Sequence, residues 1–234
     1  MGRDFEADVN TILSTNWDTV ESAIVPDTGN VKLAGGAHWV RATYLYADLA
    51  NSSKMAKNFD RRVTAKIIKS FLQSATYLVQ QNGGRVISFD GDRILGVFTG
   101  GLKNTNAARC ALNLNWVVRE VIRKKFEAKY ESVRDADFKI SHGVGVDTGQ
   151  TLVVRGGVRG NNDLVSIGRA PNLAAKLSDL RNGYTSRITK EVFDVMHDSV
   201  KYSKTGGPLM WESASWTFLG EKIDIYRSTW MWTP

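Results

Sequence analysis

Cysteine, histidine and long apolar segments are all scarce in this chain of 234 residues. The one cysteine, Cys110, has no partner for an internal disulfide, and its register on a predicted helix indicates a buried apolar position. The three histidines lack the spacing of a metal site built on imidazole ligands. The sequence therefore excludes a disulfide-stabilised scaffold and a histidine-based zinc site.

No apolar segment approaches the roughly 20 residues that a membrane-spanning helix needs. Residues 1–8 also lack the basic-then-apolar order of a secretory signal. We therefore expect a cytoplasmic protein without a stable membrane anchor. The net charge of +7 is diffuse, so it favours anionic partners without choosing between nucleic acid, lipid and nucleotide.

The chain length fits one large domain, or one domain with a terminal extension. Apolar residues at helical spacing predict an N-terminal helix over residues 4–25, and Pro26 and Gly35-Gly36 then indicate a linker. We place this helix and linker at residues 1–37 and the main domain at residues 38–234.

The main domain predicts strands and helices in the order βαββαβ. A strand over about residues 40–48 precedes a long helix, which Asn82-Gly83-Gly84 ends. Asp90-Gly91 then predicts the turn of a hairpin, because Asp-Gly between β-rich segments is a strong hairpin signal. A helix over about 105–129 and an alternating strand over 138–146 follow. We therefore expect an α+β sandwich on an antiparallel sheet.

The remaining third of the chain predicts shorter elements. A glycine-rich and asparagine-rich stretch at residues 156–163 indicates a mobile loop between strands. After it we expect a helix over 170–180, a short helix over 189–197, and strands near 199–203, 214–219 and 222–229.

Two short segments each carry an aspartate at the end of a β-like run. These are Tyr44–Leu49, with Asp48, and Ser88–Leu95, with Asp92. Two carboxylates brought together by neighbouring strands supply the oxygen ligands that Mg²⁺ or Mn²⁺ prefers. Asp90 is interpreted as a turn former. With the polar groups of residues 165–177, the pattern predicts metal-dependent chemistry on a nucleoside triphosphate.

Four segments resemble, in order, the motifs of class III nucleotidyl cyclases, the family of adenylate and guanylate cyclases. They are residues 46–49, Gly91-Asp92, 142–149 and 167–177. The resemblance covers roughly His38 to Arg227, and it implies the ferredoxin-like βαββαβ sandwich of that family. It also implies cyclisation of a nucleoside triphosphate, with release of pyrophosphate, supported by two divalent cations, Mn²⁺ or Mg²⁺.

The resemblance assigns Asp48 and Asp92 as the metal ligands, and it adds the backbone carbonyl of Leu49 as a further ligand. Asn172 matches the asparagine that orients the ribose. Lys176 stands where the family usually has an arginine that stabilises phosphate charge. Lysine keeps that charge but loses the bidentate geometry of arginine.

Three more features follow from the family comparison. Arg169 is a candidate phosphate contact, with a solvated loop charge as the alternative. In the family the aspartates belong to one subunit, and the asparagine and the basic residue belong to the other, which implies a homodimer with shared sites. Residues 216–221 lack the lysine that often holds the triphosphate, so Lys222 or an arginine within 155–159 is the alternative.

The positions that select the base depart from the purine cyclases. Ser88 stands four residues before Asp92, where adenylate cyclases carry lysine and guanylate cyclases carry glutamate, and Val165 stands at the partner position. A short hydroxyl and an apolar branch do not supply a purine-reading pair. Tyr46, in the first motif, is a further candidate for substrate binding.

This departure resembles the bacterial Pycsar pyrimidine cyclases. Those enzymes make cyclic UMP or cyclic CMP, which activates a separate effector in anti-phage defence. We therefore expect UTP as the substrate, with CTP next.

Two alternatives stay open at this point. One is an adenylate cyclase with an atypical base pocket, and the other is a catalytically silent cyclase-like regulatory domain. Retention of Asp48, Asp92 and Asn172 argues against a catalytically silent domain. Lys176 in place of arginine, and the absence of the triphosphate lysine, keep that alternative open. A diguanylate cyclase has no place for residues 168–177, and a polymerase palm needs a longer template-binding surface. We therefore expect no nucleic-acid partner.

Overall fold

The computed structural model describes residues 2–234. Within that range nine strands form one sheet: β1 (Asp18–Ser22), β2 (Gly36–Ala50), β3 (Arg85–Asp90), β4 (Arg93–Phe98), β5 (Ser141–Val158), β6 (Asn161–Ile167), β7 (Ser186–Thr189), β8 (Glu212–Phe218) and β9 (Glu221–Ser228). The helices are α1 (Phe5–Ser14), the 3-10 turn η1 (Thr28–Asn30), α2 (Ser52–Asn58), α3 (Arg61–Gln81), α4 (Lys103–Trp116), the π-helical η2 (Val117–Arg123), α5 (Lys124–Lys129), α6 (Glu131–Arg134), α7 (Arg169–Asp179), α8 (Lys190–Val195) and α9 (Asp198–Lys201).

The predicted α+β fold with βαββαβ order is confirmed. Strands β2, β3, β4 and β5, with α3 and α4 between them, lie in the spatial order β3-β4-β2-β5. The sheet continues through β7, β9 and β8, while β1 pairs with β2 and β6 pairs with β5. Most pairs are antiparallel as expected, but β1–β2 and β5–β7 are parallel, so the sheet is mixed.

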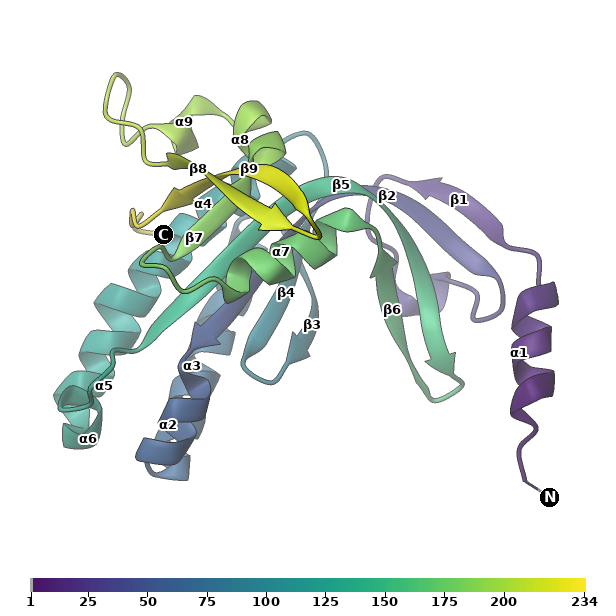
Figure 1. Cartoon of the computed structure of the whole chain (residues 1–234), viewed down its shortest axis with the longest axis horizontal. Coiled ribbons are helices and arrows are strands. Elements are labelled where there is room, and N and C mark those ends of the chain that lie inside the picture. Colours follow the sequence, from purple (N-terminus) through teal and green to yellow (C-terminus); the bar gives the residue numbers. More distant parts are fainter. Residues whose placement is uncertain (1) are drawn as a thin grey trace.

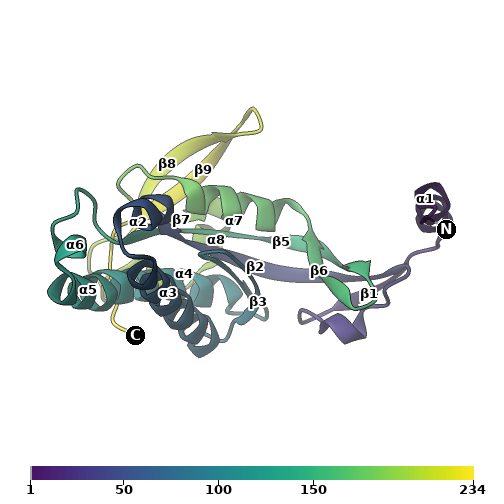
Figure 2. The same cartoon turned by 90° about the horizontal axis from the view of Figure 1, so that it is seen from below.

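Helices cover both faces of the sheet, as Figure 1 and Figure 2 show: α3, α4 and α5 lie on one side and α7 lies on the other. The predicted apolar stripe of α3 is buried against the sheet, with Ile67 and Phe71 inaccessible to solvent. Gly83, in the left-handed conformation at φ +75°, follows α3 where the sequence predicts its end. The predicted second helix runs through α4, η2 and α5, with a π-helical stretch in the middle.

Two glycines of β5 allow α7 to approach the sheet closely. A Cβ on Gly143 would overlap the carbonyl oxygen of Ser178, and a Cβ on Gly145 would overlap that of Ala174. The residues that alternate with these glycines, including Val144, are buried with the α3 and α4 side of the core. The glycine-valine alternation in the motif at 142–149 therefore has a packing explanation.

The predicted helix over residues 4–25 was wrong in its second half. Helix α1 ends at Ser14, and Thr15 adopts an extended conformation. Residues 18–22 then form β1, which pairs in parallel with the start of β2. Thr19 and Val20 are β-branched and favour extended backbone, and the free edge of β2 supplies the pairing.

Two further expectations were wrong. Residues 156–163 form the end of the β5–β6 hairpin, in which Arg155 Nε donates to Asn162 Oδ1 at 2.7 Å. Only residues 159–160 lie between the two strands. The expected strand at 199–203 begins as α9, because His197 Nδ1 accepts a hydrogen bond from the Ser199 amide and caps the helix.

Cys110 is buried in the core as predicted, and burial raises the pKa of its thiol to about 12. None of the helices in residues 2–234 combines the length and apolar character that a membrane crossing requires.

Candidate active site

Asp48 lies near the end of β2, where two neighbouring strands flank it. Its register partners are Arg93 on β4 and Gly143 on β5. The strand continues to Ala50, two residues beyond the predicted end. The Asp48 side chain is 13% exposed, so the carboxylate is largely shielded yet still reaches the surface.

Asp92 lies in the two-residue turn between β3 and β4. The sequence predicts the turn at Asp90-Gly91, but the structure shifts it by one residue to Gly91-Asp92. Gly91 has a φ of +60°, which favours glycine. The Leu49 amide donates to the Asp92 carbonyl oxygen at an N···O distance of 3.4 Å. The hairpin tip is therefore tied to the end of β2, next to Asp48.

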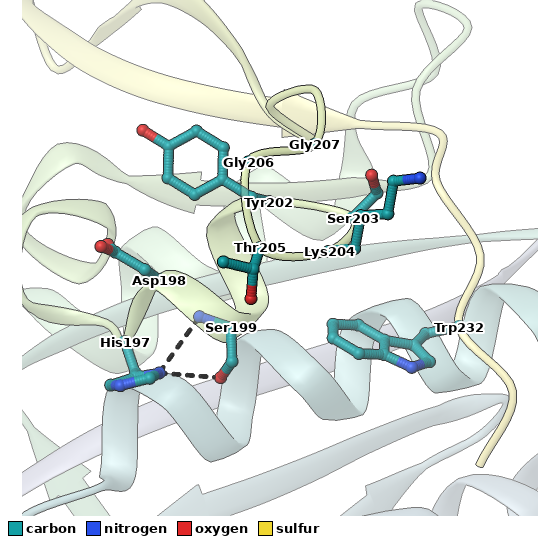
Figure 3. A pocket seen from close by; sticks show the side chains of 10 residues that line it. All are labelled: His197, Asp198, Ser199, Tyr202, Ser203, Lys204, Thr205, Gly206, Gly207 and Trp232. Carbon is teal, nitrogen blue, oxygen red and sulfur yellow. Dashed lines mark hydrogen bonds between the residues drawn. The ribbon is translucent and has the colours of Figure 1, made fainter.

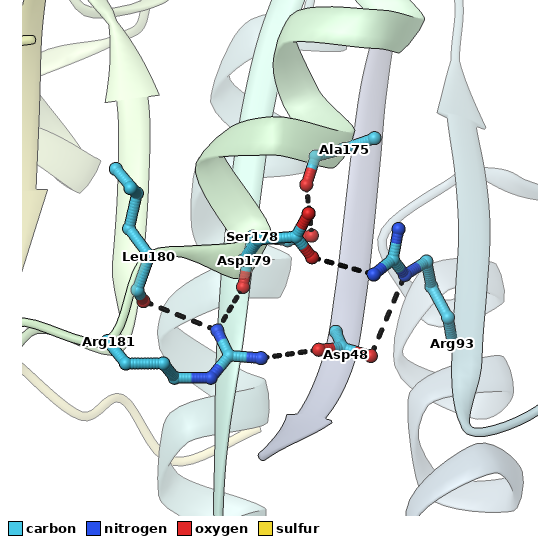
Figure 4. A network of polar contacts seen from close by, with 7 residues as sticks. All are labelled: Asp48, Arg93, Ala175, Ser178, Asp179, Leu180 and Arg181. Carbon is cyan, nitrogen blue, oxygen red and sulfur yellow. Dashed lines mark hydrogen bonds and ion pairs between the residues drawn. The ribbon is translucent and has the colours of Figure 1, made fainter.

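Two arginines hold the Asp48 carboxylate between them (Figure 4). Arg181, after α7, forms an ion pair with Asp48 Oδ2, and Arg93 Nε lies 3.6 Å from Asp48 Oδ1. Arg93 also pairs with Asp179 at 2.6 Å. Burial raises the pKa of Asp48 and the nearby Asp92 carboxylate raises it further, whereas Arg93 and Arg181 oppose both effects. The Asp92 carboxylate thus disfavours ionisation of Asp48 unless a cation compensates.

This pair of carboxylates fits a divalent cation. Asp92 Oδ2 is buried and has no hydrogen-bond partner in the part of the chain that the structure describes. A buried carboxylate oxygen without a donor is costly unless a cation is bound to it. Groups of three or more His, Cys, Asp or Glu side chains with metal-site geometry are absent from residues 2–234. A site of two carboxylates is still sufficient for Mg²⁺, which takes its other ligands from water and substrate phosphates.

Asn172 and Lys176 lie on the exposed side of α7, one helical turn apart. Asn172 Nδ2 donates to the Gly168 carbonyl at 3.3 Å, within the same helical turn. Asp179, which reaches Arg93 beside Asp48, is seven residues further along the helix. At 1.5 Å per residue, Asn172 lies about 10 Å along the axis from that network. One chain therefore does not bring Asn172 to Asp48.

Arg169 lies at the start of α7 in a separate charged cluster. It pairs with Glu191 at 3.0 Å and approaches the buried Asp147 at 4.0 Å. Thr189 Oγ1 donates to Asp147 Oδ1 at 2.6 Å. Burial raises the pKa of Asp147 to about 6, against the lowering effect of the Thr189 hydrogen bond. The Arg169 side chain is 51% exposed, which leaves it accessible to a phosphate.

The predicted base-selecting residues lie on strands that are not adjacent. Ser88 is half-buried on β3, and Val165 is 47% exposed on β6. The residues before them, Ile87 and Leu164, pack against one hydrophobic cluster on the α7 side. Both strands thus converge on that cluster.

Tyr46 lies on β2, two residues before Asp48, and is partly buried against the same cluster. The Arg93 guanidinium stands 6.0 Å from the centre of its ring. Burial raises the pKa of the Tyr46 hydroxyl, so this phenol is a neutral donor at physiological pH.

The candidate replacements for the missing triphosphate lysine lie in different parts of the fold. Lys222 lines a cavity of about 380 Å³ together with Arg169. Arg155 is engaged by Asn162 in the hairpin, and Arg159 lies at the hairpin turn. Lys222 therefore shares a surface with a predicted phosphate contact, whereas Arg155 is held elsewhere.

A larger cavity, of about 830 Å³, lies beside α9 (Figure 3). Its lining comes from residues 197–207 and Trp232, and the hydrogen bonds drawn within it join His197 to Ser199. None of the predicted site residues lines it.

Sequence reasoning did not identify Arg93, Arg181 and Asp179. Arg181 and Asp48 are 133 positions apart, and Arg93 and Asp179 are 86 apart. No local pattern joins residues at such separations. The one available signal was the position of Arg93 directly after Asp92.

His142 lies on β5, in the core of the domain. It is buried, and burial lowers the pKa of its imidazole to about 3, so the ring is neutral. In the described part of the chain, neither ring nitrogen has a hydrogen-bond partner.

Comparison with known proteins identifies the family. No protein-family model matches the chain. The chain is 51% identical over 232 residues to a uridylate cyclase from Rhodovulum sp. (strain MB263), covering 99% of this chain and 97% of that protein. It is 40% identical to a uridylate cyclase from Burkholderia cepacia, covering 96% of this chain and 95% of that protein.

The fold matches solved cyclase structures. The adenylyl cyclase CyaB from P. aeruginosa superposes with a TM-score of 0.68 at 17% identity, over 82% of this chain and 95% of that one. At that identity the match establishes the fold, and the two relatives above establish the family. The chain therefore belongs to the uridylate cyclase family and has the fold of the class III nucleotidyl cyclases.

Proposed function

We propose that two copies of this chain form shared active sites that convert UTP to its 3′,5′-cyclic nucleotide and pyrophosphate, with CTP as the next-best substrate. The observation that carries the proposal is the meeting of Asp48 and Asp92, where Asp92 Oδ2 is buried without a partner. Relatives at 51% and 40% identity are named uridylate cyclases, which supports the choice of UTP.

Asp48, Asp92 and the carbonyl of Leu49 would hold two divalent cations, Mn²⁺ or Mg²⁺. When bound there, the cations would lower the pKa of the attacking 3′-hydroxyl and stabilise charge on the transferring and leaving oxygens. The protein supports this role by fixing the hairpin tip to β2 through the Leu49–Asp92 backbone hydrogen bond. Arg93 and Arg181 keep the Asp48 carboxylate oriented.

The other half of the site is proposed to come from α7 of the second copy. Asn172 and Lys176 are both exposed and one helical turn apart, so they can contact the same bound molecule. Asn172 would hydrogen-bond the ribose without adding charge, and Lys176 would neutralise phosphate charge. Arg169 and Lys222, which line one cavity, would assist with the remaining phosphates.

Selection of a pyrimidine is proposed to depend on Ser88, Val165 and Tyr46. The Ser88 hydroxyl can donate or accept one hydrogen bond, and the apolar Val165 offers none. This pair lacks the charged group that reads a purine edge in adenylate or guanylate cyclases. Tyr46 adds an aromatic ring and a neutral hydroxyl beside the carboxylates.

We extend the proposal to the cellular role. The cyclic nucleotide would act in the cytoplasm as a second messenger on a separate effector in anti-phage defence. The resemblance to Pycsar cyclases in the base-selecting positions supports this role.

The test is product analysis with purified protein. We would incubate the protein separately with ATP, GTP, CTP and UTP in the presence of Mn²⁺ and resolve products by chromatography and mass. We expect cyclic UMP from UTP, and less cyclic CMP from CTP. Cyclic AMP as the main product would instead identify an adenylate cyclase with an atypical pocket. Binding of nucleotide without turnover would indicate a silent domain.

A further inference from the structure

The N-terminal helix α1 carries its apolar stripe on the surface. It projects from the end of the arm that β1, the start of β2 and the β5–β6 hairpin form, far from α3 (Figure 1 and Figure 2). None of its ten residues is buried. The stripe is 54% to 77% exposed and consists of Phe5, Val9, Ile12 and Leu13. An isolated helix shorter than about 12 residues is marginal in water, so α1 needs a surface to pack on.

An apolar groove lies between α3 and β3, which is an end strand of the sheet. It has a volume of about 790 Å³. Leu72 lines it together with Tyr77 and Phe89, which are 61% and 54% exposed. Its lining on α3 extends over residues 65–80, about 22 Å of helix axis, whereas the ten residues of α1 span about 15 Å. This α3–β3 groove is therefore long enough to hold α1.

The helix α1 is acidic. It contains Glu6 and Asp8 but no lysine or arginine. Asp8 pairs with Arg3 at 2.5 Å, whereas Glu6 has no ion pair within residues 2–234. The acidic side chains flank the apolar stripe, so they would lie at the rim of any groove that covers it.

The helix α3 is basic. It has no acidic residue, and its four basic residues are Arg61, Arg62, Lys66 and Lys69. Asp60, which pairs with Arg62 at 3.5 Å, and Asp90, which follows Phe89, offset part of this charge. Lys69 lines the groove and has no ion pair in the described chain. The charges of α1 and of the α3–β3 groove are therefore complementary.

Within one chain, α1 cannot lie along the groove while β1 stays paired. Asp18, the first residue of β1, is the register partner of Gly36 at the start of β2. Arg85, at the near end of β3, is level with Tyr44 of β2 through Val97. From Gly36 to Tyr44 the strand covers roughly 26 Å, whereas residues 15–17, which link α1 to β1, span about 10 Å. The occupant of the groove must therefore come from another molecule.

We propose that α1 of one copy of this chain docks in the α3–β3 groove of a second copy. The apolar stripe covers Tyr77 and Phe89, and Glu6 lies beside Lys69. In a two-fold dimer the exchange is reciprocal, so each dimer holds two such helices in grooves. Trp17, exposed between α1 and β1, continues the apolar surface along the arm.

A second copy is the occupant that these observations favour, because the same chain carries both the helix and a groove of matching length and charge. An anionic membrane fits the acidic α1 less well, since helices that lie on membranes are typically basic. The docking rests on the homodimer of the proposed function, but not on its chemistry. The test therefore uses no nucleotide.

Crosslinking of the full chain with a short bis-maleimide tests the contact. We would mix Val9→Cys with Gln73→Cys, allow the subunits to exchange, and identify the linked peptides by mass spectrometry. Gln73 is exposed and lines the groove, whereas the native Cys110 is buried and does not compete for the reagent. Ala7→Cys is the matched control, because Ala7 is exposed about 200° around α1 from Val9.

We expect the link between positions 9 and 73 to form about fivefold more than the link between positions 7 and 73. Leu13→Asp, added to Val9→Cys, should reduce it about tenfold by placing a charge in the apolar contact. Equal yields from Val9→Cys and Ala7→Cys would overturn the proposal. A link between two copies of Val9→Cys in its place would also overturn it, since α1 would then pair with α1.

Charge reversal provides a second test, with the dimer dissociation constant from sedimentation as the readout. Glu6→Lys and Lys69→Glu should each raise that constant about threefold, as expected for an exposed ion pair. The double variant should return toward the wild-type value. Losses that simply add in the double variant would overturn the pairing of Glu6 with Lys69.

Two further outcomes separate this proposal from its alternatives. Cosedimentation of the protein with phosphatidylglycerol vesicles, abolished by Leu13→Asp, would assign α1 to a lipid surface and overturn the docking. A chain that forms no cyclic product, yet links positions 9 and 73, would refute the proposed reaction and leave this interface standing.

Discussion

The backbone of Leu49 and the backbone of Asp92 are joined by a hydrogen bond, with an N···O distance of 3.4 Å. This bond connects the end of β2 to the tip of the β3–β4 hairpin, and it brings the Asp92 carboxylate into electrostatic contact with Asp48. The backbone sets the separation of the two acids, so replacing either side chain need not disturb the geometry of the site.

We expect Asp92→Asn to reduce turnover more than about 100-fold while leaving the fold intact. The amide has the shape of the carboxylate but lacks the charge that holds a cation. Asp90→Asn is the matched control, because Asp90 is exposed at the end of β3 two residues away. Cyclic nucleotide formation and Mn²⁺ binding check the prediction. Full activity in Asp92→Asn would refute the two-carboxylate metal site.

The double substitution Ser88→Lys with Val165→Asp should shift preference from UTP toward ATP. The pair would supply a donor and an acceptor for a purine edge, which the present hydroxyl and isopropyl groups do not. We would measure kcat/KM for UTP and ATP and compare their ratio with that of the wild type. An unchanged ratio would show that the base is read by other residues.

Gly145→Ala should destabilise the protein by about 2 kcal/mol or more, because its Cβ would overlap the backbone of α7 at Ala174. Gly149→Ala lies on the same strand and is the control. Its nearest Cβ contact, with Ala170 at 3.5 Å, is ordinary van der Waals distance. Urea unfolding of both variants measures the difference. Equal stability of the two variants would contradict the close packing of α7.

Asp147 should make stability fall as the pH rises. Its pKa is raised to about 6 from an ordinary 3.8, so the folded state holds the proton more tightly than the unfolded chain. The resulting stabilisation is complete below about pH 4 and is lost as the pH rises through 6, a change of about 3 kcal/mol.

Asp147→Asn should remove this contribution, since the amide keeps an acceptor for Thr189 but does not titrate. We would measure unfolding free energies between pH 4.5 and 7.5 for both proteins, taking the difference at each pH. As the pH rises, the unfolding free energy of the wild type should fall relative to that of the variant. A constant difference would mean that Asp147 titrates normally.

The sequence was sufficient to locate Asp48 and Asp92 because their signals are local. One is a carboxylate near the end of an apolar strand, and the other is a glycine-bearing turn between two β-rich runs. The helix α3 was predictable for the same reason, since its apolar spacing is a property of consecutive residues.

What the sequence did not predict depends on contacts between distant segments. Residues 18–22 form a strand only because the edge of β2 accepts them, and their side chains are nearly all exposed, so no burial pattern marks them. Arg181 reaches Asp48 only after α7 has packed on β5 through Gly143 and Gly145.

The central claim is that each active site combines Asp48 and Asp92 of one copy with Asn172 of another. It is tested most directly by mixing Asp48→Ala with Asn172→Ala, each of which alone has two defective sites per dimer. A mixed dimer contains one intact site, so random exchange should restore about a quarter of wild-type activity. Native mass spectrometry would establish that mixed dimers form. No recovery in a sample with proven mixed dimers would contradict the shared site, and recovery near a quarter would support it.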